Sequence, residues 1–266
     1  YSSRLIPIWD GSAWAITDFA AELVNTLTDT TKNPAAAAAS KNYDLFVWSD
    51  AGTIRLSRGP AWTSDTARGT GAGTTELQQV QGVWCNAQAI TNGPAAGYGT
   101  YVGSFGTNGS STADDTVLLR HVWSLWNRAD RKVRLIEATA TWSYTTAAWR
   151  PLNNSTTNRI SVLAGLAEDV LTVSWLFAAS NTAAGTNQAV SVCLDGTTTE
   201  NADVQVPVSS GVSNTSFGAG GLWTGPPGLG RHFLQMVEYG AGSGTTTFYG
   251  TIANLIKTGM TGVWRS

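Results

Sequence analysis

The chain has 266 residues, a length that suits one large all-β domain or two smaller ones. Charged residues make up only 13%, about half of the ~25% found in an average soluble domain, whereas hydrophobic residues make up 42%, so a packed core is expected and disorder is excluded. With a net charge of −2 and no run of about 18 apolar residues, we expect neither nucleic acid nor a membrane as a partner.

The first element with a helical pattern is the segment ITDFAAELVNTL, residues 16–27. Asp18 is a suitable N-cap, and Phe19, Leu23 and Leu27 recur at a spacing that places them on one helix face. The sequence therefore predicts one short helix here, and helix signals are scarce elsewhere.

Residues 43–62, YDLFVWSDAGTIRLSRGPAW, predict a strand, a tight turn and a second strand. The first strand is apolar on both faces, with Leu45 and Val47 on one side and Phe46 and Trp48 on the other. Such a strand is buried on both faces, and its second face could meet another sheet or a neighbouring subunit. We predict a subunit interface at these four residues, because an exposed apolar face of this kind is rare in monomers.

The composition changes near residues 107–115, TNGSSTADD, after which the strand patterns become longer and more regular. We place a boundary there, between an N-terminal assembly or attachment region, residues 1–111, and a main sandwich domain, residues 112–266. The apolar run at 117–128 fits either a helix or a buried strand, and its β-rich surroundings favour a strand.

Clean alternation of apolar and polar residues predicts half-buried antiparallel strands in the second half of the chain. Residues 232–240 and 245–252 flank a Gly-rich turn and predict a hairpin. Short strands with regular turn signals predict an all-β fold, an antiparallel, jelly-roll-like β-sandwich with little helix. The predicted core comprises Ile136, Ala140, Trp142, Val173, Trp175, Val190 and Val192.

The cysteines and histidines are too few and too far apart for a metal site or a disulfide framework. Cys85 and Cys193 are expected to be free and buried, and His121 and His232 to be structural residues inside strands. We therefore expect no cofactor, no metal and no disulfide.

Glycoside hydrolysis would need only two carboxylates on a β scaffold, and the candidates are Glu137, Glu168, Asp169 and Glu238. Glu137 and Glu238 are interpreted as solvent-facing strand residues, because the sequence shows no evident acid/base pair. The chain is therefore predicted not to be an enzyme.

Two further groups of residues have both a structural and a functional interpretation. Trp62, Trp149 and Trp223 lie beside Pro or Gly in predicted loops, where they would either pack between strands and subunits or stack on a glycan. A basic cluster is interpreted as a surface with ion pairs to Asp130 and Glu137, with an acidic partner protein as the alternative. The cluster comprises Arg120, Arg128, Arg131, Lys132 and Arg134.

Four stretches carry a resemblance to a known group of proteins: residues 43–105, LWNRADRKVR at 125–134, TWSYTTAAWRPLNNS at 141–155 and GLGRHFLQMVEYGAGSGTTTFYGT at 228–251. Together they resemble virion proteins of tailed bacteriophages, of the fibre, spike or head-decoration type. The likeness covers most of the chain from residue 43 to residue 251, and the matching phrases are structural rather than catalytic.

The resemblance implies a β-rich, multimeric structural component on the exterior of a phage particle, attached to other virion proteins and displaying an outward surface. It also implies self-association, and a homotrimer is the expected stoichiometry because trimers are common among phage appendages. The alternatives are a lectin-like module that binds a host surface glycan and, with less support, a glycan depolymerase.

Overall fold

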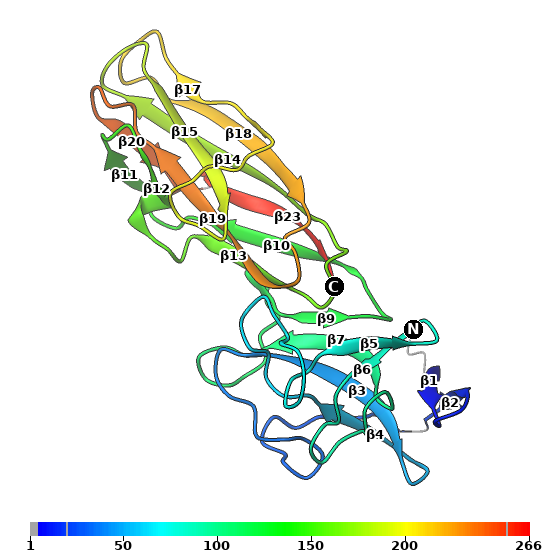
Figure 1. Ribbon diagram of the computed structural model, residues 1–266. Coiled ribbons are helices and arrows are strands. Elements are labelled where there is room, and N and C mark those ends of the chain that lie inside the picture. Colours follow the sequence, from blue (N-terminus) through cyan, green and yellow to red (C-terminus); the bar gives the residue numbers. More distant parts are fainter. Residues whose placement is uncertain (1–4, 20, 254) are drawn as a thin grey trace.

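The protein is described here by a computed structural model that covers residues 5–19, 21–253 and 255–266. These residues form three main sheets of mostly antiparallel strands, and the helical content is a single 3-10 turn at Leu152–Asn154 (Figure 1). The prediction of an all-β sandwich with little helix is confirmed. No helix within the described ranges is long and apolar enough to cross a membrane.

The N-terminal part is built around a six-stranded sheet with the order β4-β3-β7-β6-β5, in which β9 also pairs with β7. A separate two-stranded hairpin, β1-β2, precedes it in the chain. The bounds are β1 (Leu5–Trp9), β2 (Trp14–Asp18), β3 (Asn42–Asp50), β4 (Thr53–Arg58), β5 (Leu77–Val80), β6 (Val83–Asn86), β7 (Thr100–Gly106) and β9 (Val122–Ser124).

The sandwich packs a seven-stranded sheet against a second six-stranded sheet. The seven-stranded sheet has the order β10-β23-β14-β18-β16, with β20 beside the end of β14 and β11 beside β20. Its bounds are β10 (Asp130–Ile136), β11 (Thr141–Tyr144), β14 (Leu171–Asn181), β16 (Val204–Gln205), β18 (Phe217–Gly225), β20 (Thr246–Tyr249) and β23 (Gly259–Arg265).

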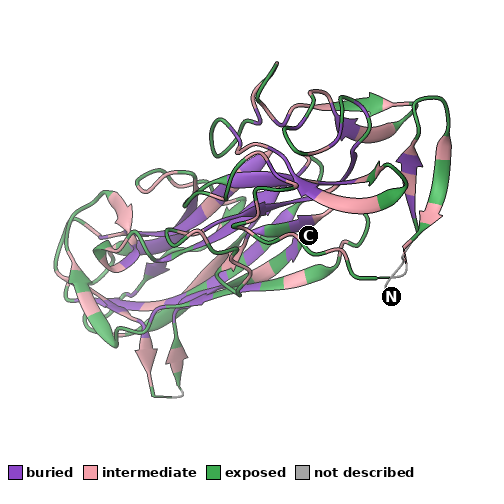
Figure 2. Ribbon diagram, turned by 90° about the horizontal axis from the view of Figure 1, so that it is seen from below, coloured by how far each residue is buried: buried purple, intermediate pink, exposed green. Residues whose placement is uncertain are grey.

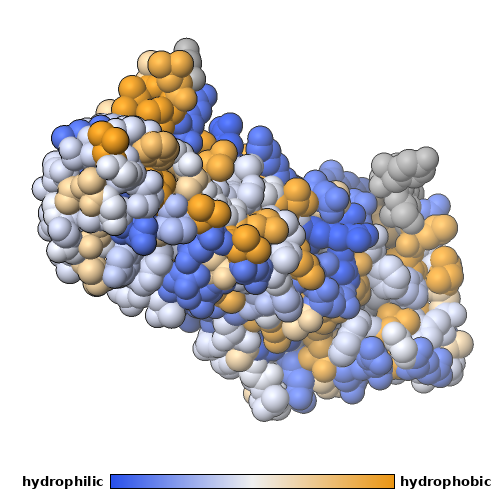
Figure 3. Space-filling model, turned by 90° about the horizontal axis from the view of Figure 1, so that it is seen from above, coloured by the Kyte–Doolittle hydropathy of each residue, from blue (hydrophilic) through white to orange (hydrophobic). Residues whose placement is uncertain are grey.

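The opposing sheet of the sandwich has the order β17-β15-β19-β13-β8, and β12 also pairs with β19. A small hairpin, β21-β22, stands out from the body on the side of the seven-stranded sheet (Figures 2 and 3). The bounds are β8 (Leu119–Arg120), β12 (Trp149–Pro151), β13 (Arg159–Ala164), β15 (Asn187–Leu194), β17 (Val208–Ser209), β19 (Gly230–Tyr239), β21 (Thr251–Ile252) and β22 (Ile256–Lys257).

One hydrophobic core runs through both parts of the chain. It contains Phe46 and Tyr101 from the N-terminal sheet together with Trp175 and Trp264 from the sandwich. Trp123 of β9 lies between them, with its ring stacked on that of Tyr101 at 6.2 Å between centroids. Residues after position 112 therefore complete the N-terminal sheet, and the boundary predicted there does not coincide with a break in packing.

Both faces of β3 are covered inside the chain. Phe46 is 0% exposed in the main core, and Val47 is 4% exposed in a second cluster that includes Ile6 and Ile8 of the β1-β2 hairpin. The two other predicted interface residues, Leu45 and Trp48, are half-buried. The argument that this strand needs a neighbouring subunit as its second cover was therefore wrong, because the N-terminal hairpin supplies that cover.

The helix predicted over residues 16–27 is absent from the described part of that segment. Its first three residues, 16–18, belong to β2, and residues 19 and 21–27 have no helical structure. The start of the segment is taken up by strand pairing, because Ile16, Thr17 and Asp18 pair with Pro7, Ile6 and Leu5 of β1. Its end is held by tertiary contacts instead of a helix: the buried guanidinium of Arg58 donates to Asn25 Oδ1 at 2.9 Å and to the Leu27 carbonyl at 3.3 Å, so tertiary context overrides local helix propensity.

Local pairing predictions were right in one place and wrong in another. The run at 117–128 contains two short strands, β8 and β9, which confirms the preference for strand over helix.

The predicted hairpin of residues 232–240 and 245–252 is wrong. β19 pairs with β12, β13 and β15, whereas β20 pairs with β11 and β14, so the Gly-rich segment between them crosses from one sheet to the other.

The predicted core is confirmed for β14 and β15 and partly wrong around β10. Ile136 is 39% exposed and Ala140 is exposed, because the alternating run is not one continuous strand. Strand β10 ends at Ile136, and its inward residues are Val133 and Leu135. The remaining predicted residues are placed as follows: Trp142 is half-buried against the core, and Val173, Trp175, Val190 and Val192 are buried.

A buried ion pair fastens the N-terminal part to the sandwich. Asp44 on β3 is 0% exposed and accepts hydrogen bonds from Arg68 Nε at 2.7 Å, Thr75 Oγ1 at 2.9 Å and Ser104 Oγ at 2.6 Å. Arg68 Nη2 also donates to the carbonyl oxygen of Gly165, which follows β13, at 2.6 Å. One guanidinium thus joins the two parts of the chain.

We expect Arg68→Met to lower the free energy of unfolding by about 3–5 kcal/mol, because it leaves the Asp44 carboxylate buried without a counter-charge. Denaturant titration followed by tryptophan fluorescence measures the loss. The matched control is Arg55→Met, which removes the exposed Arg55–Asp50 pair and should cost less than about 1 kcal/mol. Equal losses in the two variants would contradict this role for Arg68.

Candidate functional site

The tryptophans predicted to contact a glycan are mostly inside the protein. Trp62 is 2% exposed beneath the guanidinium of Arg68, 4.3 Å from its ring centroid. Trp223 is 7% exposed and points into the sandwich from β18. Only Trp149 is partly accessible, and its ring packs against Tyr239 at 5.3 Å. Trp62 and Trp223 therefore cannot stack on a glycan, because both rings are buried.

The carboxylate of Glu238 is buried, which corrects its interpretation as a solvent-facing residue. It accepts hydrogen bonds from Trp142 Nε1 at 2.5 Å, Arg150 Nε at 2.7 Å and the Asn153 backbone N–H at 3.2 Å. Burial raises the pKa of Glu238, and these donors act against that rise. Both carboxylate oxygens are engaged, so this group supports the fold of the 150–153 segment.

Glu137 is also buried, at 5% exposure, and is held by a similar set of donors. Its oxygens accept from the Thr139 backbone N–H at 2.7 Å and from the side chain of Asn158. Asn153 Nδ2 donates to Thr139 Oγ1 at 2.9 Å, which links the surroundings of Glu137 to those of Glu238. The arrangement of these hydrogen bonds is that of a structural network rather than of an acid facing a base across a cleft.

The basic cluster is paired, but not with the predicted partners. Arg120 Nη1 lies 3.1 Å from Asp115 Oδ1, and Arg131 binds the other oxygen of the same carboxylate. Arg128 pairs with Asp169 at 3.0 Å and with Glu168. The expected pairs to Asp130 and Glu137 are absent from the described residues.

Two members of that cluster make no ion pair with any described residue. Lys132 and Arg134 are exposed on β10, on the face directed away from the sandwich core, and neither makes an ion pair within the described part of the chain. They are the basic side chains that remain available to a partner.

The two histidines are structural and differ in their electrostatics. Ser161 Oγ donates to the carbonyl of His232, so it accepts from Nε2 of His121, and burial lowers the pKa of His121 to about 4. Burial also lowers the pKa of His232, but its ring faces Asp195 Oδ2 at 2.6 Å and the Leu229 carbonyl at 3.0 Å, and these two acceptors raise the pKa above its ordinary value.

Cys85 and Cys193 are buried and free, as predicted. Burial raises the pKa of the Cys85 thiol to about 11, which keeps it protonated and unreactive at neutral pH. Among the residues that the structure describes, no three His, Cys, Asp or Glu side chains come together as metal ligands would.

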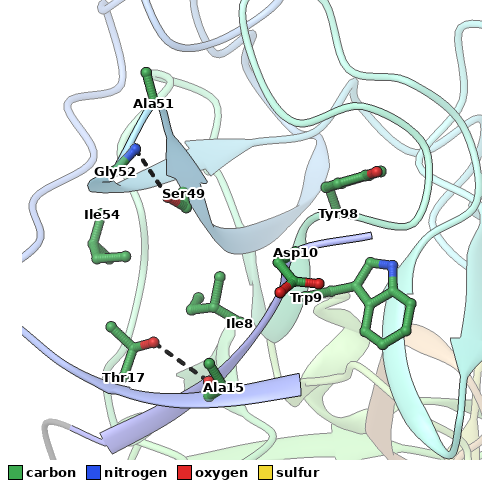
Figure 4. A pocket seen from close by; sticks show the side chains of 10 residues that line it. All are labelled: Ile8, Trp9, Asp10, Ala15, Thr17, Ser49, Ala51, Gly52, Ile54 and Tyr98. Atoms are coloured by element: carbon green, nitrogen blue, oxygen red, sulfur yellow. Dashed lines mark hydrogen bonds between the residues drawn. The ribbon is translucent and has the colours of Figure 1, made fainter. Parts of the chain in front are cut away.

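A pocket of about 460 Å³ lies between the β1-β2 hairpin and the β3-β4 turn (Figure 4). Ile8 and Ile54 form its apolar part, while the rings of Trp9 and Tyr98 stand at one end, beside the Asp10 carboxylate. An aromatic ring, a carboxylate and nearby hydroxyls are groups that bind sugars in proteins. The remaining residues around the pocket are Ala15, Thr17, Ser49, Ala51 and Gly52.

The turn between β1 and β2 positions the polar end of this pocket. Asp10 Oδ1 accepts from the backbone N–H groups of Ser12 at 2.7 Å and Ala13 at 2.8 Å, and these hydrogen bonds lower the pKa of Asp10. Trp9 and Trp14 are cross-strand partners whose rings lie 5.2 Å apart. This site was not among the predicted ones, although the segment WDGSAW, residues 9–14, carries the signal of a tight turn between two tryptophans.

Comparison with known proteins adds little to this picture. No protein-family model and no curated protein matches the chain. A solved structure of infectious bursal disease virus, Gx strain, aligns with 86% of this chain and 65% of its own chain, at 13% sequence identity and a TM-score of 0.28. The chain thus spans just under two thirds of that protein's length, and a TM-score this low carries no argument about function.

We expect the two histidines to change the stability of the protein with pH in opposite directions, because the pKa of His232 is raised and that of His121 is lowered. Because the pKa of His232 is higher in the folded protein than the ordinary 6.5, the folded state binds more protons just above pH 6.5. The stabilisation is complete below pH 6.5 and is lost as the pH rises through the folded pKa. Denaturant titrations between pH 6 and 9 should therefore show that His232→Gln removes part of the decline in stability seen in the wild type.

His121→Gln is the matched control, because the sign at His121 is reversed. With a folded pKa of about 4, the unfolded state binds more protons between pH 4 and 6.5, so His121 costs stability as the pH falls through that range. The variant should flatten the curve on the acid side and leave the alkaline side unchanged. If both variants altered the same side, the assignment would be wrong.

Proposed function

We propose that this protein is a non-enzymatic structural component of a bacteriophage virion, of the fibre, spike or head-decoration type. It attaches to the particle and displays an outward surface. The support is the phrase-level resemblance of residues 43–251 to such proteins, together with an all-β body of low charge. Self-association and contact with other virion proteins are part of the proposal, whereas the trimer is the stoichiometry that the resemblance implies and is not part of it.

The observation that carries the proposal is the joining of the two parts of the chain through one core. A display protein has to hold its outward surface in a set direction relative to its attachment. Here β9 completes the N-terminal sheet, and Arg68 binds Asp44 on one side and the Gly165 carbonyl on the other. Residues 1–111 would form the attachment part and residues 112–266 the displayed part of an elongated body (Figure 1).

The pocket of Figure 4 favours glycan binding as a second candidate function. It replaces the predicted glycan site, since Trp62 and Trp223 are buried. Trp9 and Tyr98 offer ring faces and Asp10 offers an ionised acceptor for sugar hydroxyls. The pocket lies within residues 8–98, in the part assigned to attachment, so the two functions are compatible if this part also faces outward on the particle.

Purified virions of the phage that encodes this chain should contain the protein in a defined number of copies, accessible to antibody on intact particles. Quantitative mass spectrometry and immunogold microscopy measure both. A reducing-sugar assay on host surface polysaccharide, run with the purified protein, should show no release. The proposal would be refuted by a protein present only in the soluble fraction of infected cells and absent from purified particles.

If the pocket binds glycan, Trp9→Ala should weaken the binding of array-selected sugars about tenfold, because it removes the stacking ring. Trp126→Ala is the control, since Trp126 is 58% exposed and lies outside the pocket. Binding measured by glycan array and calorimetry should be unchanged in that variant. No binding by the wild type, or equal losses in the two variants, would remove this second function.

A further inference from the structure

The outer face of the seven-stranded sheet is open, and apolar side chains on it alternate with threonine, serine and glycine. Side chains alternate along β14, so that Val173 and Trp175 enter the core while Leu176 is 68% exposed. Val204 on β16 and Val263 on β23 are 60% and 45% exposed on the same face. Exposed apolar side chains that share a face without charged residues between them indicate an interaction site.

The strand register arranges this face in rows. One row contains, from edge to edge, Arg134, Thr261, Ser174, Leu222 and Val204. The next contains Ile136, Gly259, Leu176 and Gly220, and ends beside Val206, whose backbone N–H donates to the Gly220 carbonyl.

Charges are confined to the margins of this face. The β10 margin carries Lys132 and Arg134, while Asp130 and Arg265 stand opposite each other in register at one end. The β16 margin carries Asp203, exposed, which accepts a hydrogen bond from the Thr224 backbone N–H. The outward residues between these margins are uncharged: Thr172, Ser174, Leu176, Ala178, Gly218, Gly220, Leu222, Thr224, Gly259, Thr261 and Val263.

The β21-β22 hairpin, hereafter the arm, projects from the same side of the molecule (Figures 2 and 3). Its Leu255 is 90% exposed. The arm connects β20 to β23, both of which pair with the same edge of β14, and so it leaves the sheet beside Leu176 and Ala178.

We propose that this face binds a second copy of the chain, sheet against sheet, about a two-fold axis parallel to β14. Such an axis reverses the order of the strands across the sheet but leaves each residue at the same height along the strand direction. As a result, β10 of one copy lies over β16 of the other. Asp203 is one residue from Val204 and level with the interval between Lys132 and Arg134. Each basic margin therefore meets an acidic margin.

The other in-plane axis, perpendicular to the strands, is disfavoured. It would place β10 over β10 and bring Lys132 and Arg134 against their own copies. Like charges held together at an interface oppose association. The charge distribution thus selects one of the two face-to-face arrangements.

The selected arrangement also accommodates the arm. The arm leaves the sheet at the strand position next to β14 on the side of β10. Because the axis reverses the strand order, the arm faces β18 of the partner, which is next to β14 on the side of β16. At that level β18 carries Gly218 and Gly220, which pair with Ala178 and Leu176. A side chain at Gly218 would meet only the Phe177 carbonyl, at 3.6 Å, so the position is open to the arm of a partner.

This inference goes beyond the proposed function, since pairing of two copies does not require a virion. The purified wild type should have twice the 28.0 kDa mass of one chain by light scattering during size exclusion. Arg134→Glu and Asp203→Arg should each raise the dissociation constant at least about tenfold, and the double variant should restore it. Lys41→Glu, an exposed charge change in the N-terminal part, is the control and should leave the dimer intact.

Two further variants test the centre of the face. Leu176→Asp should dissociate the dimer, whereas Val24→Asp, at an equally exposed residue outside the sheet, should not. Gly218→Gln should fold normally, because space exists for its side chain, but should obstruct the arm and weaken the dimer. Circular dichroism checks the fold of each variant.

Three outcomes would overturn the proposal: a wild type that is monomeric at about 100 micromolar, a wild type that is trimeric, or single charge variants that the double variant does not rescue. The concentration of about 100 micromolar is chosen because it lies well above the dissociation constant of a stable dimer. None of these would bear on whether the protein occurs in purified virions, so the proposed function stands or falls separately.

Discussion

The organisation of this protein depends on one buried ion pair, Asp44 with Arg68. A carboxylate that is fully removed from water is tolerable only when its charge is balanced and its oxygens are hydrogen-bonded. Arg68, Thr75 and Ser104 meet that requirement, and each comes from a different segment of the N-terminal part. Because Arg68 also binds the Gly165 carbonyl, satisfying Asp44 draws the sandwich against the N-terminal sheet.

Alternation of apolar and polar residues predicted the buried side chains correctly where a strand has one face in the core and the other in solvent. Val173 and Trp175 were placed correctly, because β14 has its other face in solvent. The same rule failed for Ile136, because β10 ends there and the next inward position is held by Glu137. A carboxylate in a core position is invisible to a hydropathy pattern, since its burial depends on donors such as Asn158 that come from a distant part of the chain.

The candidate site was harder to predict than the fold for a related reason. Trp62 stands next to a proline in sequence, yet it is buried beneath Arg68, and only the tertiary position of that guanidinium puts it there. Trp9 lies in the wall of a pocket together with Tyr98, which lies far along the chain, so no local pattern could bring the two together. Sequence patterns report which residues alternate, whereas a site depends on which distant loops meet.

The chain has few charged residues, and several of them are buried, so fewer remain for its surface. Among the residues that the structure describes, six charged side chains are buried, namely Asp44, Arg58, Arg68, Glu137, Asp169 and Glu238. Charges that hold the interior together are not available to solvate the outside, and the outer face of the seven-stranded sheet is left with threonine, glycine and valine between Arg134 and Asp203. Absence of charge at the centre is one feature of the buried part of a protein–protein interface. The charges that hold the two parts of the chain together are thus not at the centre of this face, which is the face that we propose a second copy covers.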